Sequence, residues 1–164
     1  MKTADSLKRV LQSQLAGYKV LVDLLRRERA ALAAFDRQAV EDLSKEKDTL
    51  ALKLRLLEEE RLRLINKLAR ETDKGEQALR GVSATMSREP MTLLQVAVIT
   101  GDEEFRELRS SFKSLVQVVG ELNEFNRFLI DRSLQYIRLN TAFFQAHGIT
   151  GKGTAAGVSI AKEA

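Results

Sequence analysis

Side chains suited to catalysis or metal binding are few in this sequence. The chain has one histidine, His147, and no cysteine, which excludes disulfides, thiolate zinc sites and cysteine nucleophiles. A single histidine near the expected end of a helix is more often a favourable partner of the helix dipole than a base or a ligand. The Glu-x-x-His pairs of two-metal helical bundles are missing as well. We therefore predict no catalytic residue, no metal and no cofactor.

Two sets of charged residues could have a chemical role, one acidic and one basic. Glu58, Glu59 and Glu60 would suit acid–base chemistry if their carboxylates converged, but successive helix positions point in different directions, so we expect a solvated face. Basic residues that could contact phosphates are Arg26, Arg27, Arg29, Arg55, Arg61, Arg63, Lys67 and Arg70. Acidic residues interleave with them and no aromatic side chain offers a stacking platform there. The net charge of +4 is therefore weak support for nucleic-acid binding.

The elements that carry these residues are indicated by an apolar heptad stripe, which occurs in three runs. Alternating steps of four and three residues place a stripe on one side of a helix, and a long stripe requires partner helices. The stripe positions are Leu7, Leu11, Gln14, Tyr18, Leu21 and Leu25; Val40, Leu43, Lys47, Leu50, Leu54, Leu57, Arg61, Leu64 and Leu68; and Phe105, Leu108, Phe112, Leu115, Val119, Leu122, Asn126, Leu129, Ser133, Tyr136, Asn140 and Phe143. We predict an all-α protein: an elongated antiparallel bundle or coiled coil of three long helices plus one short helix, with a disordered C-terminal tail.

The first two predicted helices meet at residues 35–36. The first runs from the capping residues of segment 3–6 to about residue 34, and the second from about residue 37 to residue 71. Asp36 is a good N-cap for the second helix. The stripe changes register at this point, so the two segments do not share one uninterrupted seam. The sequence leaves open whether the break is a kink or a full reversal.

The remaining helices follow a segment without periodicity. Residues 72–91 contain Gly, Ser, Thr and the only proline, and predict a loop. Thr92 and Gln95 have capping-box spacing, which predicts a short, nearly all-apolar helix over 93–99 that fills a core or a groove. Thr100 and Glu103 repeat that spacing before a long helix over about 103–145.

Composition places these helices in one domain. The sequence of 164 residues predicts a helical domain over 1–147 and a flexible tail over 148–164, where the glycines do not form a phosphate loop because they follow a helix. The first residues lack the apolar core of a secretory signal, and no segment approaches the length of a membrane span. We expect a cytoplasmic protein, monomeric or weakly self-associating, that binds no nucleic acid.

The end of the last helix combines a polar seam with large apolar side chains off the seam. We consider nine residues as candidates for partner binding: Asn126, Phe128, Ile130, Ser133, Leu134, Ile137, Asn140, Phe143 and Phe144. One explanation is a broad core surface in which asparagine fixes the helix register. The other is an uncovered apolar surface that receives a partner helix. A self-assembling coiled-coil scaffold without a client is a further alternative, and a nucleic-acid-binding adaptor a weaker one.

Several segments of the chain resemble one known family. They read LLRRERAALAAFDRQAVEDLSKEKDTL, LLEEERLRLINKL and ELNEFNRFLIDRSLQYI, and a Gly-rich C-terminus follows. Together they are similar to the flagellar export chaperones of the FlgN type over about residues 15–145. The shared features are the break before Asp36, the Lys/Glu-rich start of the second helix, and the aromatic end of the last helix. The most specific segment contains Asn123 and Asn126 after Leu122, together with Ile130, Leu134 and Ile137.

This resemblance implies an all-α bundle without enzymatic activity. Members of the family hold the C-terminal helical segments of hook-associated proteins, which form the hook–filament junction. They prevent early association and deliver these clients to components of the flagellar type III export apparatus. Binding in the family is attributed to the C-terminal part of the chaperone, which corresponds here to Asn126 through Phe144 and the tail.

Overall fold

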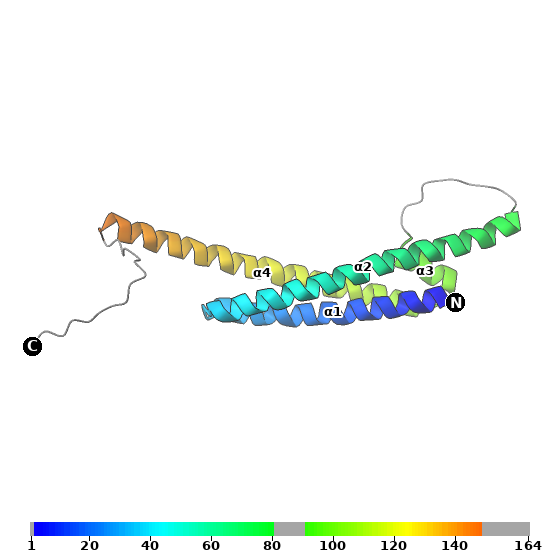
Figure 1. Ribbon diagram of the computed structural model, residues 1–164, viewed down its shortest axis with the longest axis horizontal. Coiled ribbons are helices and arrows are strands. Elements are labelled where there is room, and N and C mark those ends of the chain that lie inside the picture. The colour runs from blue at the N-terminus through cyan, green and yellow to red at the C-terminus, as the bar shows by residue number, and fades with distance from the viewer. Residues whose placement is uncertain (1, 81–90, 149–164) are drawn as a thin grey trace, which may run out of the picture. The chain divides into compact units, whose positions relative to one another are not determined.

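The computed structural model describes residues 2–80 and 91–148, with the side chains of 2–72 and 91–148. Within these ranges it contains the helices α1 (Lys2–Ala33), α2 (Arg37–Arg80), α3 (Leu93–Thr100) and α4 (Glu104–Ala146) and no strand (Figure 1). The predicted fold class is therefore confirmed. The chain divides into two compact units, Met1–Leu129 and Ile130–Ala164. The predicted tail over 148–164 lies almost wholly outside the described residues, and the two-part division at residue 147 stays a prediction.

The break between α1 and α2 is a full reversal. The Asp36 amide donates to the Ala31 carbonyl at 3.0 Å and the Phe35 amide to Leu32 at 3.2 Å. This is the Schellman pattern that ends a helix, and it places Phe35 in the left-handed region with φ of 55°. Asp36 then caps α2, because its Oδ1 accepts from the Ala39 amide at 3.0 Å.

Contacts between α1 and α2 pair the start of one helix with the far part of the other. Side chains pair Thr3 with Glu71, Gln14 with Glu58, and Arg27 with Glu46. The two helices are thus antiparallel, as Figure 1 shows. Gly17 explains one close approach, since a Cβ at this position would lie 2.7 Å from the Leu54 Cδ2. The glycine that weakens the helix locally therefore gives α2 room to pack.

Within the first unit, α4 runs parallel to α1. Gln12 donates to Glu104 at 2.7 Å, the rings of Tyr18 and Phe112 meet edge to face at 5.9 Å, and Asn126 reaches the Leu25 carbonyl. One core cluster joins all four helices; its buried members are Leu7, Leu11, Leu64, Ile65, Leu68, Val96, Ala97, Phe105 and Leu108. A smaller cluster near the reversal contains Leu24, Ala31 and Leu43.

Two predictions about helix ends were wrong. Helix α2 continues to Arg80 instead of ending at residue 71, because residues 72–80 consist mainly of good helix formers and one glycine does not stop a long helix. Residues 81–90 of the predicted loop lie outside the described residues, and Met91 belongs to no helix. Thr100 does not cap α4: it ends α3, and Asp102 Oδ1 accepts from the Glu104 amide at 3.0 Å.

The short helix α3 forms as predicted. Thr92 and Gln95 make the capping box, and Gly101 ends the helix with φ of 66°. Val96 and Ala97 are buried in the core, which confirms that α3 fills it. Its other face remains apolar and exposed.

Candidate functional site

The polar residues of the heptad stripes in the first unit meet one another across helices. Lys47 of α2 forms an ion pair with Glu28 of α1, and Glu28 Oε2 accepts from Asn126 Nδ2 of α4 at 2.8 Å. Asn126 also donates to the Leu25 carbonyl at 3.0 Å. Glu28 and Asn126 are 5 % and 2 % exposed, so this cluster is a buried link between three helices.

Sequence reasoning missed Glu28 in this cluster. The signal was present, because Glu28 occupies the next heptad position after Leu25, just as Lys47 and Asn126 occupy stripe positions in their own helices. A polar residue in one stripe predicts a polar partner in another. Asn126, a candidate for partner binding, thus has the register-fixing role considered for it as the alternative, and it does not belong to an exposed surface.

The three consecutive glutamates of α2 form ion pairs with arginines of the same helix. Glu58 binds Arg61, Glu59 lies 3.4 Å from Arg55 Nε, and Glu60 binds Arg63. The adjacent guanidinium groups hold the pKa of Glu58 and Glu60 below their usual range, because they favour the charged carboxylates. Carboxylates held in this way are poor proton donors near neutral pH. The same pairs engage Arg55, Arg61 and Arg63, three of the eight basic residues that could otherwise contact phosphates.

The other eight candidate residues are not buried. Phe128 belongs to the first unit and is 56 % exposed. The second unit holds the remaining seven, which we call the C-terminal surface: Ile130, Ser133, Leu134, Ile137, Asn140, Phe143 and Phe144. Ser133 and Asn140 are half-buried and the others are exposed. No described residue of this unit is buried.

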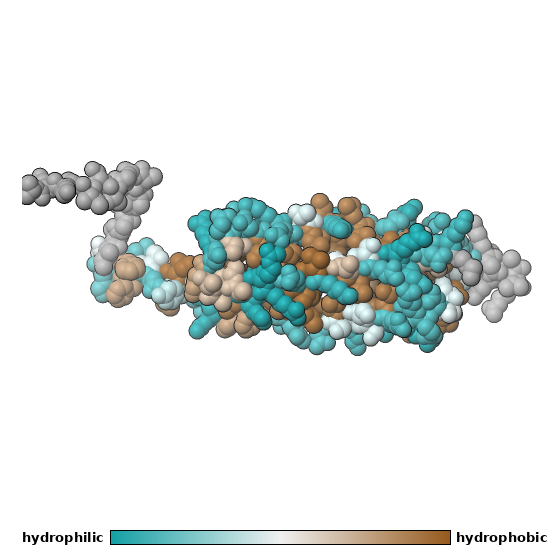
Figure 2. Space-filling model, turned by 90° about the horizontal axis from the view of Figure 1, so that it is seen from below, coloured by the Kyte–Doolittle hydropathy of each residue, from teal (hydrophilic) through white to brown (hydrophobic). Residues whose placement is uncertain are grey.

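The helix periodicity arranges the C-terminal surface around one apolar face. Ile130, Leu134, Ile137 and Phe144 follow steps of four, three and seven residues and so lie along one side of α4 over about 21 Å. Thr141 occupies the skipped position, and its hydroxyl donates to the Ile137 carbonyl at 2.8 Å. The polar group on this face is thus satisfied within the helix. On the side shown in Figure 2, apolar side chains appear among hydrophilic ones along this unit.

Phe143 lies toward a second side of the same helix. Its ring centroid is 4.1 Å from that of His147 and 5.8 Å from that of Phe144. His147 Nδ1 lies 2.8 Å from the Phe143 carbonyl oxygen at the helix end. The histidine therefore interacts with the last turn of α4, and among the described residues no group of three or more His, Asp and Glu side chains could hold a metal ion.

Comparison with known families decides the wider assignment. The sequence model of the FlgN protein family matches residues 1–153. The chain belongs to the FlgN family. FlgN proteins are flagellar export chaperones, so the expected resemblance is confirmed. Searches of curated proteins and of solved structures found no match to this FlgN chain. None of its described helices combines the length and apolar character needed to cross a membrane.

Proposed function

We propose that this protein is a cytoplasmic chaperone of hook-associated proteins, which it delivers to the flagellar type III export apparatus. It binds an amphipathic, helical C-terminal segment of the client and so prevents early association of that segment. One observation supports this most strongly: Ile130, Leu134, Ile137 and Phe144 line one helix face with 39–57 % of each residue exposed. Apolar side chains at such spacing suit the docking of a partner helix.

The apolar face has the dimensions of a helix-binding site. Its length of about 21 Å matches four turns of a client helix. Full burial of one fully exposed, large apolar side chain contributes about 1.5–3 kcal/mol, and these four residues are already about half-covered. Their remaining burial beneath a client therefore offsets part of the ordering penalty. Phe143 adds exposed aromatic surface that a client can contact, while Phe128 is an exposed aromatic residue of the first unit. Asn126 is left out of this proposal because it is buried.

The polar members of the C-terminal surface tune the same interaction. Ser133 and Asn140 lie along the seam beside the apolar face and are half-buried. The Asn140 amide keeps the unoccupied face hydrated, which limits nonspecific association. A client that covers Asn140 must replace water there, which limits affinity and favours later release to the export apparatus.

The proposal is tested by capture of purified hook-associated proteins. We expect the Leu134→Asp/Ile137→Asp variant to lose capture by at least tenfold, because two charges would be desolvated beneath the client helix. The matched control is the double variant Leu52→Asp/Leu56→Asp on α2, where both leucines are about 60 % exposed. Capture should be unchanged in this control. Undiminished capture by the α4 variant would rule out the C-terminal surface as the binding site.

The scaffold alternative makes the opposite prediction for molecular mass. If the C-terminal surface meets its own copy, light scattering should report a stable oligomer that the α4 variant dissociates. The chaperone proposal expects a monomer or weak oligomer with the same mass in both variants. Binding through apolar contacts should also change little between low and high salt, whereas a nucleic-acid adaptor would show a steep salt dependence.

A further inference from the structure

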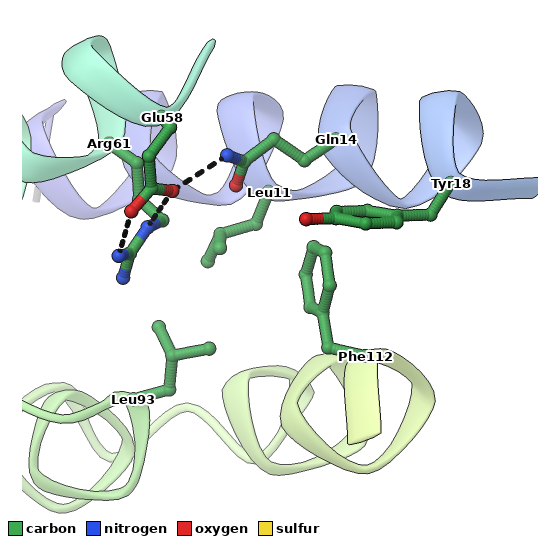
Figure 3. A pocket seen from close by; sticks show the side chains of 7 residues that line it. All are labelled: Leu11, Gln14, Tyr18, Glu58, Arg61, Leu93 and Phe112. Carbon is green, nitrogen blue, oxygen red and sulfur yellow. Dashed lines mark hydrogen bonds and ion pairs between the residues drawn. The ribbon is translucent and has the colours of Figure 1, made fainter. Parts of the chain in front are cut away.

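A cavity of about 230 Å³ opens in the first unit, between residues of all four helices (Figure 3). Leu11 of α1, Leu93 of α3 and Phe112 of α4 form its apolar part. An engineered protein cavity of about 150 Å³ is large enough for benzene. The cavity in this protein is therefore large enough for one six-membered ring with a small substituent.

Two oxygens that face this cavity form no hydrogen bond with the described residues: Gln14 Oε1 and the Tyr18 hydroxyl. Gln14 is 4 % exposed, and its Nε2 donates to Glu58 Oε2 at 3.0 Å. Figure 3 shows its carbonyl oxygen and the Tyr18 hydroxyl turned toward the space beside Leu11. A ligand that offers both a donor and an acceptor pairs with both oxygens while its ring contacts the apolar part of the cavity.

The charges around the cavity cancel. Arg61 Nε donates to Glu58 Oε2 at 2.7 Å, and Arg61 Nη2 donates to Glu58 Oε1 at 2.5 Å. The Arg61 guanidinium lowers the pKa of Glu58, so both groups stay charged near neutral pH. This wall therefore carries no net charge, and it favours a neutral ligand over an ionic one.

We propose that this cavity binds a neutral phenol group. The ring lies among Leu11, Leu93 and Phe112, the phenol O–H donates to Gln14 Oε1, and the phenol oxygen accepts from the Tyr18 hydroxyl. Free small molecules and tyrosine side chains of a partner share this chemistry. The site consists entirely of first-unit residues, so it does not depend on the proposed function of the C-terminal surface.

Titration of the full-length protein with phenol and with benzene, followed by NMR, tests the proposal. We expect saturable shifts around Tyr18 and Phe112 with both probes. Tyr18→Phe should lower the ratio of phenol to benzene affinity about three- to tenfold, the size of one neutral hydrogen bond. The matched control Tyr136→Phe changes the other tyrosine of the chain and should leave the ratio unchanged.

Two further measurements make the result decisive. Leu93→Phe should fill the cavity and abolish the response to both probes. If Leu93→Phe does not fold, the change in affinity ratio caused by Tyr18→Phe still tests the proposal. If the protein binds both phenol and N-acetyl-tyrosinamide, the natural ligand is a tyrosine side chain of a partner protein. If the protein binds phenol but not N-acetyl-tyrosinamide, the natural ligand is a small molecule. The proposal is overturned if phenol gives no saturable shift near Tyr18, or if Tyr18→Phe leaves the affinity ratio unchanged.

Discussion

Helix α4 contributes residues to both units, and its apolar side chains are buried in the first unit and exposed in the second. In the first unit Phe105 is fully buried and Leu108 is 6 % exposed, because side chains of α1, α2 and α3 pack against them. In the second unit Phe144 is 46 % exposed and Ile137 57 %. The heptad spacing continues through both regions. A stripe thus indicates which side chains share a face, and not whether another element covers that face.

The polar seam shows the same contrast. Asn126 is buried in the first unit and donates to Glu28 and to the Leu25 carbonyl. Asn140, two heptads later, is half-buried in the second unit. The first residue connects α4 to α1 and, through Glu28, to α2, while the second belongs to the surface that we propose for client binding. Identical residues at equivalent seam positions thus carry different proposed roles.

The largest expected effect separates two phenylalanines of α4. Phe105→Ala should lower the free energy of unfolding by about 3–5 kcal/mol, because it leaves a cavity in the main core. Phe144→Ala should change it by no more than about 0.5 kcal/mol, since the side chain is exposed. Urea unfolding followed by circular dichroism measures both. Similar losses in the two variants would show that Phe144 is covered within the chain, contrary to the comparison.

A smaller effect separates the two seam asparagines. Asn126→Ala removes a donor from the buried Glu28 carboxylate and should lower the free energy of unfolding by about 1–3 kcal/mol. Asn140→Ala should stay within about 0.5 kcal/mol of the wild type. The same urea experiment applies. If Asn126→Ala were as stable as Asn140→Ala, the buried link between α1, α2 and α4 would contribute nothing to stability.

The smallest effect is a pH dependence confined to the first unit. Lys8 Nζ lies 2.5 Å from Asp102 Oδ2, and this ammonium group lowers the pKa of Asp102 in the folded state. The unfolded chain therefore takes up this proton first, at a pH near about 4. The stabilisation is complete above that pH and is lost as the pH falls through the folded-state pKa.

Lys8→Met tests this dependence because it removes the cation. Between pH 7 and pH 3 the variant should lose less free energy of unfolding than the wild type, as measured by urea unfolding at each pH. An equal loss in both proteins would show that the Lys8 pair does not contribute to acid sensitivity.

Much of the helical architecture was predictable from local signals. Asp36 and Thr92 are side-chain caps, and the structure confirms a cap at each position. The end of α2 was not predictable in the same way, because a loss of apolar periodicity after residue 71 does not prevent good helix formers from continuing the backbone helix. The sequence also left the reversal at Phe35 undecided. Backbone hydrogen bonds hold this residue in the left-handed conformation, and an aromatic residue does not predict that conformation as a glycine would.

The candidate site was predictable only in part. The sequence indicated that large apolar residues lie beside a polar seam at the end of α4, and it left open whether another element covers them. It did not separate Asn126 from Ser133 and Asn140, because all three occupy equivalent positions in the repeat. That separation depends on Glu28 and Lys47, which approach Asn126 from other helices.

The sequence by itself determined that this chain is helical, which residues share each helix face, and that catalytic groups are scarce, because periodicity, capping and residue chemistry are local properties. The tertiary structure decided which stripes are covered, which polar residues pair, and where an unfilled cavity remains. These features depend on distances between side chains far apart in the chain, which no local pattern specifies. The exposed face of Ile130, Leu134, Ile137 and Phe144 is such a feature, and the proposed chaperone function depends on it.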